Sequence, residues 1–330
     1  MTEKSLKSVS AAGRVTAGKS IKGSCAPSGR LQAIKKDFSM YKSVYVMFIP
    51  VLIYYILFHY LPMYGAIIAF KDFSPRLGFL GSPWVGFQHF VNFFTRPTFF
   101  QVLMNTVRIS FSTLVFGFPA PILLALLMNE MRSRRLCRIV QNITYMPHFI
   151  SMVIVCGMIK TFTADTGIIN DVIEFFGGSR TSLLGEPKYF TSIYVISGIW
   201  QEIGWGSIIY LAAMIGVDES LYEAATIDGA GRWKQTLYVT LPGISTTIIV
   251  MLILRIGSIL SVGYEKIILL YNDATLNVAD VISTYVYRKG LLELDWGFST
   301  AVGLFNSVIN CLFLFGANFL SKKFNEVSLW

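Results

Sequence analysis

The sequence is poor in charged residues. Asp, Glu, Lys and Arg make up only 14% of its 330 residues, whereas 54% are hydrophobic, and a soluble domain has about 25% charged residues. So few charges cannot cover the surface of a globule of this size, which excludes a large soluble domain. The formal net charge of +9 does not indicate a nucleic-acid-binding protein, because the basic residues form no single stripe. Composition therefore predicts an integral membrane protein.

Cysteine and histidine are scarce as well. The four cysteines form no CxxC pair, which argues against a disulfide framework and against a zinc site. The three histidines lie far apart and show no metal-ligand spacing, so we predict no bound metal and no cofactor on this chain. A membrane-embedded enzyme would need converging nucleophile, base or metal ligands, and the sequence shows none. The cysteines are Cys25, Cys137, Cys156 and Cys311, and the histidines are His59, His89 and His148.

Long uncharged runs dominate the rest of the chain. Each approaches or exceeds the roughly 20 residues that a helix needs to cross the hydrocarbon core of a bilayer. The fold class predicted is therefore an all-α integral membrane protein with six transmembrane helices. Their expected positions are about 43–64, 106–129, 139–162, 190–216, 243–263 and 298–320.

The basic residues orient these spans. With six spans, both termini share one side with the loops 130–138 and 217–242. That side holds 17 Lys and Arg, and the opposite loops hold 8 although they are longer in total. Because cytoplasmic loops carry the excess of basic residues, we expect cytoplasmic N- and C-termini in the bacterial inner membrane. The domains expected are a cytoplasmic tail, 1–42, and a transmembrane permease domain, 43–330.

The N-terminal tail contains a nucleotide-binding pattern that we reject. Residues Gly13 to Ser20 fit GxxxxGK[ST], but that loop works only between a buried strand and a helix. No strand pattern precedes it, and Pro27 with its flanking glycines opposes a helix after it. We expect this tail to be largely disordered up to a short interfacial helix over 33–41.

The sequence of the cytoplasmic loop 217–242 predicts a pair of short helices. Asp218 is a good N-cap, and Glu219 in the first turn favours the helix dipole. Gly229 and Gly231 are expected to end this helix and to let the chain reverse. A second short helix is expected over 233–238, and Pro242 should separate it from the fifth span. Such a pair can be a docking surface for another protein or merely a solvated loop.

This loop resembles the coupling motif of ABC importer permeases, E-A-A-x-x-x-G followed by a hydrophobic residue, any residue, Leu and Pro. A valine stands where isoleucine is commoner. The carbohydrate branch of the family, with permeases of polysaccharide and complex-oligosaccharide importers, is similar over about residues 40–330. Residues carrying the coupling motif are Glu223, Ala224, Ala225, Asp228, Gly229, Leu241 and Pro242. Further stretches that carry the resemblance are 84–90, 105–106, 118–121, 145–148, 197–200, 204–206, 279–285 and 328–330.

The resemblance implies the type I importer fold and a set of partners. The implied partners are a second, homologous permease, two ATPase subunits and an extracytoplasmic solute-binding protein. ATP-Mg is expected on the ATPase subunits and not on this chain. The implied substrate is an oligosaccharide, including acidic ones such as fragments of alginate. It also implies that this chain is no enzyme. An ion-coupled secondary transporter is the alternative, but it would be expected to show internal repeats and intramembrane carboxylates, and no repeat is visible here.

Ionisable residues within the spans mark a candidate substrate pathway. Glu202 and Arg255 should face protein or water, because a charge at the bilayer centre costs about 2.5–3.5 kcal/mol. They can pair with each other, line the sugar pathway, or do both. The candidate pathway residues are Trp200, Gln201, Glu202, Trp205, Tyr210 and Arg255.

Two other features of the spans are interpreted as packing. His148, beside Pro147, is expected to be a packing or kink element rather than a ligand. The small residues that recur every four positions in the last span favour close helix packing, with Asn306 and Asn310 able to bond across helices. The small residues are Ser299, Gly303, Ser307 and Cys311.

Overall fold

The computed structural model describes residues 40–325 and 328–329. Regular structure in these ranges is helical, apart from an isolated antiparallel bridge between Lys71 and Trp84. The tail up to residue 39, with most of the expected interfacial helix and the whole GxxxxGKS pattern, lies outside the described residues.

The chain divides into two units, at residues 1–64 and 65–330. The described part of the first unit is helical: α2 (Lys42–Tyr55), the π-helical turn η1 (Ile56–Tyr60) and α3 (Leu61–Met63). No side chain of α2 is buried, and its residues are mostly apolar, as expected of a helix that meets lipid or another chain.

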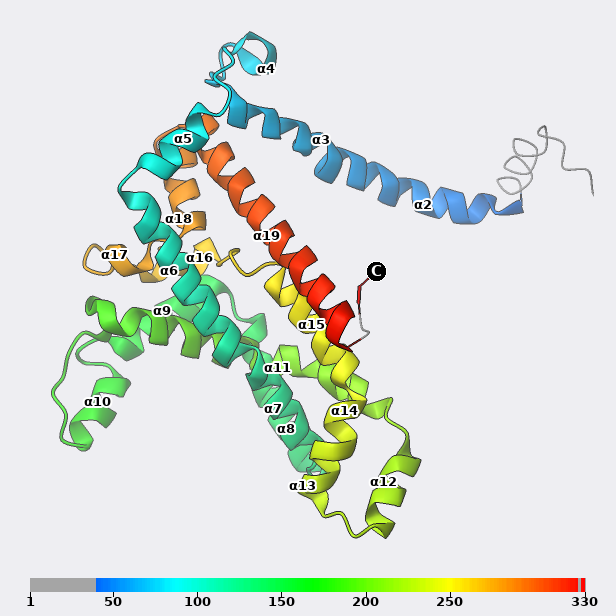
Figure 1. Cartoon of the computed structure of the whole chain (residues 1–330). Coiled ribbons are helices and arrows are strands. Elements are labelled where there is room, and N and C mark those ends of the chain that lie inside the picture. Colours follow the sequence, from blue (N-terminus) through cyan, green and yellow to red (C-terminus); the bar gives the residue numbers. More distant parts are fainter. Residues whose placement is uncertain (1–39, 326–327, 330) are drawn as a thin grey trace, which may run out of the picture. The chain divides into compact units, whose positions relative to one another are not determined.

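The second unit contains the remaining helices (Figure 1). Before loop 217–242 they are η2 (Tyr64–Phe70), α4 (Gly78–Gly81), α5 (Gln88–Thr95), α6 (Thr98–Ser112), η3 (Thr113–Gly117), α7 (Pro119–Asn129), α8 (Arg134–Tyr145), η4 (Met146–Phe149), α9 (Met152–Thr163), α10 (Ile168–Phe175), η5 (Leu183–Gly185) and α11 (Pro187–Ile215). From that loop onward they are α12 (Glu219–Ile227), α13 (Arg232–Gln235), η6 (Thr236–Thr240), α14 (Leu241–Gly243), α15 (Ser245–Ile256), α16 (Tyr264–Leu270), α17 (Leu276–Ala279), α18 (Ile282–Tyr287), η7 (Arg288–Leu292) and α19 (Trp296–Asn325).

Within the described ranges, four helical stretches are long and apolar enough to cross a membrane, and a bent pair can supply a fifth. The four are 42–70, 98–129, 152–175 and 296–323, and the bent pair is 232–243 with 245–256. The fourth expected span, 190–216, is occupied by the 29-residue helix α11. The all-helical fold is thereby confirmed, with boundaries that differ from the expected ones.

The third expected span, 139–162, is not one helix, so that prediction is wrong. α8 ends at Tyr145, the short 3₁₀ turn η4 follows, and α9 begins at Met152. Pro147 lies in that turn and lacks an N–H for a continuing helix. Ser151 then caps the new helix, since its hydroxyl accepts a hydrogen bond of 3.4 Å from the Ile154 N–H. The span of this region instead covers 152–175.

The fifth expected span, 243–263, is also differently built. Its helix α15 is only 12 residues long, and it meets the helix that ends at Gly243 at an angle of 60°. Residues 257–260 form turns and residues 261–263 have no regular structure, so the helix does not continue. The glycines at both ends of this segment disfavour a continuous helix.

Three clusters of buried side chains hold the second unit together. One joins α6, α9, α11 and α16 around Phe190 and Ile267. Another joins α5, α6, α18 and α19 around Phe93 and Phe298. The third joins α7 to α11 through Tyr210 and neighbouring residues. Because lipid tails are as apolar as these side chains, helices in a membrane associate through such close packing rather than through exclusion of water.

α11 crosses α8 at a glycine. A Cβ atom at Gly204 would lie only 2.1 Å from the carbonyl oxygen of Thr144, so no other residue fits without moving a backbone. Two residues further along, a Cβ at Gly206 would lie 3.0 Å from Pro121 of α7. Gly204 and Gly206, on either side of Trp205, therefore let α11 approach α8 and α7 closely. These two close approaches position the Trp205 side chain relative to both helices.

The stripe of small residues on α19 is only partly used for packing inside the unit. Ser299 is buried against Gly290, where an added Cβ would lie 2.6 Å from the serine hydroxyl. Gly303 has open space around it, and Ser307 and Cys311 are exposed.

Asn310, beside this stripe, bonds across helices as predicted. Its side chain accepts from the Leu260 N–H at 3.0 Å and donates to the Ser261 hydroxyl at 2.9 Å. The buried amide oxygen of Asn306 makes no hydrogen bond within the described part of the chain, so a bond from Asn306 across helices stays a prediction.

Candidate functional site

Loop 217–242 begins with a capped helix, α12. The Asp218 carboxylate accepts a hydrogen bond of 2.9 Å from the Ser220 N–H, which satisfies one of the free donors at the helix start. Hydrogen bonding from Ser220 holds the pKa of Asp218 below its usual value. The predicted N-cap is confirmed.

Gly229 ends α12 as predicted. Its φ of +75° lies in the left-handed region, which favours glycine. The Ala230 N–H reaches back to the Ala225 carbonyl at 2.8 Å, and the Gly229 N–H to the Thr226 carbonyl at 3.0 Å. This pair of bonds is the Schellman arrangement. Gly231 does not belong to this ending, since it is the extended residue that precedes α13.

The second helix of the loop is longer than predicted, and Pro242 does not end it. α13, the π-helical turn η6 and α14 continue from Arg232 to Gly243, with Pro242 at the start of α14. The wider π turn before the proline changes the hydrogen-bond register, so the missing N–H and the proline ring are accommodated. The chain bends one residue after Gly243, at Ile244.

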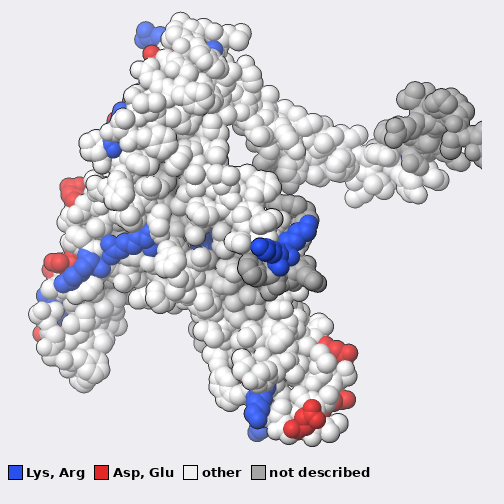
Figure 2. Space-filling view, viewed as in Figure 1, with Lys and Arg blue, Asp and Glu red and all other residues white. Residues whose placement is uncertain are grey.

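Most of the motif residues on this loop lie at its surface. Glu223, Ala224 and Asp228 are exposed, Ala225 and Leu241 are half-buried, and Pro242 is exposed. Large apolar side chains are exposed beside them, including Ile227 (86%) and Trp233 (84%). Acidic side chains gather over α12 at the lower right of Figure 2, close to basic ones over α13. Exposed apolar residues rimmed by charge are typical of a protein interaction surface.

The loop is anchored to the body of the unit. The Thr236 hydroxyl donates to the Glu130 carboxylate at 3.2 Å, and the Arg232 guanidinium donates to the Glu130 carbonyl at 3.4 Å. Inside the loop, the hydroxyls of Tyr222 and Thr240 lie 2.9 Å apart. These bonds connect α12 through Thr240 to the helix that follows it, and that helix to Glu130 at the end of α7. Sequence reasoning missed Glu130, because no local pattern links it to a loop a hundred residues later.

A cavity of about 500 Å³, the central cavity, lies between α7, α11, α15 and α16. Five of the six predicted pathway residues line it: Gln201, Glu202, Trp205, Tyr210 and Arg255. Trp200 does not. It lines a separate, largely apolar pocket with Val155 and other residues of α9. The role of these residues in transport stays a prediction.

Glu202 pairs with His148 and not with Arg255, so the alternative in which these two charges pair with each other is wrong. The Glu202 carboxylate lies 2.9 Å from His148 Nδ1. The His148 ring also stacks on Trp205, with ring centroids 4.4 Å apart and planes within 1°. His148 thus packs, as predicted, and it also partners the acid of the cavity.

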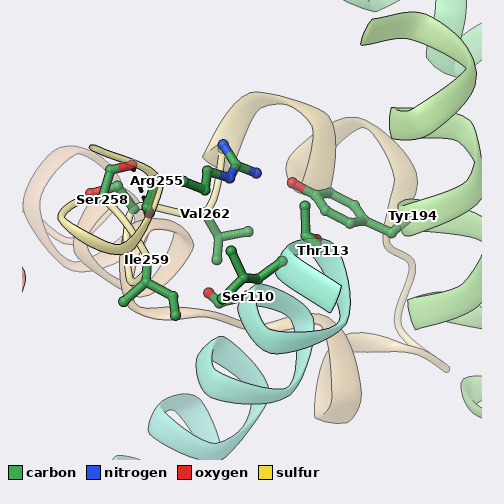
Figure 3. A pocket seen from close by; sticks show the side chains of 10 residues that line it. Ser110, Thr113, Tyr194, Arg255, Ser258, Ile259 and Val262 are labelled. Carbon is green, nitrogen blue, oxygen red and sulfur yellow. Dashed lines mark hydrogen bonds between the residues drawn. The ribbon is translucent and has the colours of Figure 1, made fainter. Parts of the chain in front are cut away.

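Arg255 reaches a second, smaller space of about 210 Å³, the side cavity. In Figure 3 the Tyr194 hydroxyl points toward the Arg255 guanidinium. Arg255, Tyr194, Thr113 and Gly263 line both the side cavity and the central cavity. The two spaces are therefore neighbours that share a wall.

Lys266 and Tyr194 are among the residues of the central cavity that sequence reasoning missed. Lys266, 5% exposed, donates a hydrogen bond of 3.1 Å to the Tyr194 carbonyl, and its ammonium lies 4.9 Å from the centre of the Tyr194 ring. Lys266 lies three residues beyond the end of the expected fifth span, 243–263, in a segment expected to be an outer loop. Tyr194 had a usable signal, since it precedes Glu202 by eight residues and so shares its helix face.

Metal binding finds no support in the described ranges, where no group of three or more His, Cys, Asp or Glu side chains converges. The polar groups of the two cavities are amides, hydroxyls and isolated charges, which suit a polar organic ligand.

Comparison with known proteins identifies the family. Residues 117–326 match the model of the binding-protein-dependent transport system inner membrane component. The chain belongs to this family. It is a multi-pass permease of the bacterial inner membrane and the membrane component, not the catalytic subunit, of a binding-protein-dependent ABC importer.

Similar proteins cover nearly the whole permease. Protein LplB of Bacillus subtilis is 46% identical over 96% of both chains. The polygalacturonan/rhamnogalacturonan transport system permease protein YteP of the same organism is also 46% identical, over 88% of this chain and 90% of its own. A chain in a crystal structure of a bacterial ABC transporter involved in the import of the acidic polysaccharide alginate matches with a TM-score of 0.82 and 43% identity, covering 89% of this chain and 99% of that one. The resemblance to carbohydrate importer permeases is confirmed.

Proposed function

We propose that this permease forms the translocation pathway of an ATP-driven importer of oligosaccharides, with acidic ones such as fragments of alginate or polygalacturonan as the first candidates. The observation that carries the proposal is the 43% identity to a chain of the alginate transporter over 89% of this permease. The 46% identity to the YteP permease supports the same class of substrate.

The central cavity suits a sugar in transit. Sugars present both hydroxyl groups and apolar ring faces, and their binding sites combine polar groups with aromatic side chains. Trp205 supplies an aromatic ring, Gln201 an amide and Tyr210 a phenol. Glu202, held by His148, and Arg255 add charge of both signs. Trp200 lines the apolar pocket beside α9 instead, so this proposal does not place it in the pathway.

We propose six spans in the expected topology. Four long apolar helical stretches and the bent pair supply five spans, and α11, a 29-residue helix in the fourth expected position, is proposed as the sixth. An even number leaves both termini on the cytoplasmic side, which the excess of basic residues there favours. The permease domain then covers 43–330, with 1–42 as the cytoplasmic tail.

Loop 217–242 is proposed as the contact with the ATPase. Its motif residues and the exposed Ile227 and Trp233 supply an apolar, charge-rimmed surface. Its bonds to Glu130 give a mechanical connection to α7, which lines the central cavity through Pro121. ATP binding on separate subunits would thereby favour one of two cavity states, since only differential binding to two states can shift their balance.

The remaining proposed partners are a second homologous permease, two ATPase subunits that hold ATP-Mg, an extracytoplasmic solute-binding protein and membrane lipid. A crystal structure of the alginate ABC transporter in complex with an alginate-pentasaccharide-bound periplasmic protein matches this chain with a TM-score of 0.82 and 42% identity. No nucleic acid is proposed as a partner.

Purification and uptake test this function. The permease should bring an ATPase subunit with it, and vesicles holding the complete complex should take up a labelled oligosaccharide only when ATP and the binding protein are present. Uptake that continued without ATP and followed an ion gradient would favour the secondary transporter and refute the proposal. A panel of neutral and acidic oligosaccharides in the same vesicles would define the substrate.

A further inference from the structure

The side cavity is lined mainly by hydroxyl groups and by one charged residue. Its polar side chains are Ser110 and Thr113 at the end of α6, Tyr194 of α11, Arg255 of α15, and Ser258 and Ser261 in the turns that follow. Figure 3 shows Arg255, Tyr194 and Ser110 on three different segments around this space. Helices distant in sequence therefore build a polar cavity beside the proposed sugar pathway.

Arg255 has no acidic partner there. No acid lines the side cavity, and Arg255 forms no ion pair with any residue that the structure describes. The nearby acids are engaged or face elsewhere: Glu202 pairs with His148, and Glu265 lines the central cavity only. A charge in this part of a membrane protein needs a partner or water, and a guanidinium offers a planar fork of donors that matches a carboxylate.

Three hydroxyl groups add hydrogen-bond donors. Ser110 is 6% exposed, and its hydroxyl has no hydrogen-bond partner within the described residues. Ser261 accepts from Asn310, which leaves its own proton free to donate. The Tyr194 hydroxyl points toward Arg255 and, in the described ranges, donates to no protein atom. By contrast, the protons of Thr113 and Ser258 are used on backbone carbonyls.

We propose that the side cavity is a carboxylate subsite of the sugar pathway. Arg255 supplies the charge, and Tyr194, Ser110 and Ser261 supply neutral donors to the carboxylate of a uronate unit as an acidic oligosaccharide passes. The assignment rests on the proposed function. Arg255 and Tyr194 line both cavities, so a sugar in the central cavity lies beside this subsite. A buried donor without a partner is costly, and the bound carboxylate removes that cost for Ser110. A neutral sugar is expected to bind less tightly in this subsite, since it carries no negative charge to pair with Arg255.

Binding to the complete purified complex tests the subsite directly. The probes are a labelled uronate trisaccharide and the same trisaccharide with its carboxyl groups reduced to alcohols, measured by equilibrium dialysis without binding protein. We expect the wild type to bind the acidic probe at least tenfold more tightly than the reduced one. Tyr194→Phe and Ser110→Ala should each weaken binding of the acidic probe roughly tenfold, as expected for hydrogen bonds to a charged group. Binding of the reduced probe should stay within twofold, and Arg255→Gln should abolish the preference.

Matched controls come from α11. Ser197→Ala removes a hydroxyl that donates to a backbone carbonyl, and Tyr189→Phe removes a phenol that lines neither cavity. Both should keep the wild-type preference. Equal affinity of the wild type for the two probes, no binding of the acidic probe, or equal losses for both probes in the variants would overturn the subsite. Vesicle uptake of both trisaccharides is measured beside binding, and its absence would refute the proposed function instead.

Discussion

Replacing Gly229 by valine should uncouple ATP hydrolysis from transport. The φ of +75° at this residue costs an L-amino acid roughly 1–2 kcal/mol, and a β-branched side chain is disfavoured further. A Cβ at Gly229 would touch nothing within 4 Å, so the penalty is one of backbone conformation and not of crowding. A shift of 1–2 kcal/mol lowers the ratio of the observed turn to other conformations about 5- to 30-fold. The bonds from Gly229 and Ala230 that close α12 would be lost with it.

The assay is substrate-stimulated ATP hydrolysis measured beside uptake, in reconstituted vesicles that hold equal amounts of complex. Asparagine tolerates the left-handed conformation, so we expect Gly229→Asn close to wild type, Gly229→Ala intermediate and Gly229→Val lowest in uptake per ATP hydrolysed. Membrane insertion should be unchanged throughout the series.

Gly231→Ser is the matched control. Gly231 lies two residues away, has φ of −69° and ψ of 166°, and leaves open space for a Cβ. Serine is also a favoured N-cap for the helix that follows. Wild-type hydrolysis and uptake in Gly229→Val, or an equal loss in Gly231→Ser, would refute the reasoning and remove loop 217–242 as the coupling element.

Four other changes test separate parts of the molecule. Glu223→Ala should reduce coupling in the same direction as Gly229→Val but less, because an exposed charge contributes about 0–1 kcal/mol; a larger effect on coupled hydrolysis would contradict this ranking. Arg255→Ala should reduce uptake while ATPase copurification stays normal, and Arg255→Lys should retain part of the uptake of an acidic oligosaccharide; wild-type uptake by the alanine variant at equal abundance would exclude Arg255 from the pathway. Gly204→Ala should lower the amount of folded complex in the membrane, because the new Cβ meets the backbone of α8 at 2.1 Å, whereas Gly157→Ala, which has open space, should not; equal yields measured by size-exclusion chromatography would refute the close crossing. Lys19→Ala should leave both hydrolysis and uptake unchanged, and a loss of hydrolysis with normal assembly would show that the GxxxxGKS pattern works.

Features that depend on neighbouring residues could be predicted from the sequence. The Asp218 cap and the end of α12 at Gly229 follow from side-chain and backbone preferences within one helical turn. The apolar runs predict membrane helices because length and hydrophobicity alone decide whether a helix can cross a bilayer. The motif in loop 217–242 is equally local, which is why the family could be identified before any fold was known.

Helix boundaries were harder to predict where two local signals compete. Pro147 and Ser151 break the third expected span although residues 139–159 contain no Lys, Arg, Asp or Glu, since a missing N–H and a new cap outweigh hydrophobicity there. Pro242 shows the opposite outcome. The π-helical turn before Pro242 lets the helix continue to Gly243. No local sequence pattern distinguishes Pro242 from Pro147.

Partners within the site were decided only by the tertiary structure. Glu202 meets His148, 54 residues earlier, and not Arg255, because the break after α8 turns His148 onto Trp205. Trp200 and Trp205 are five residues apart on α11, so they lie on different faces of that helix, and only the position of α9 and α16 shows which face meets the cavity. Ser110, Tyr194 and Arg255 come together because α6, α11 and α15 converge at the turns after Ile256. Helical periodicity determines which side chains share a face, but the bends between helices determine which faces meet.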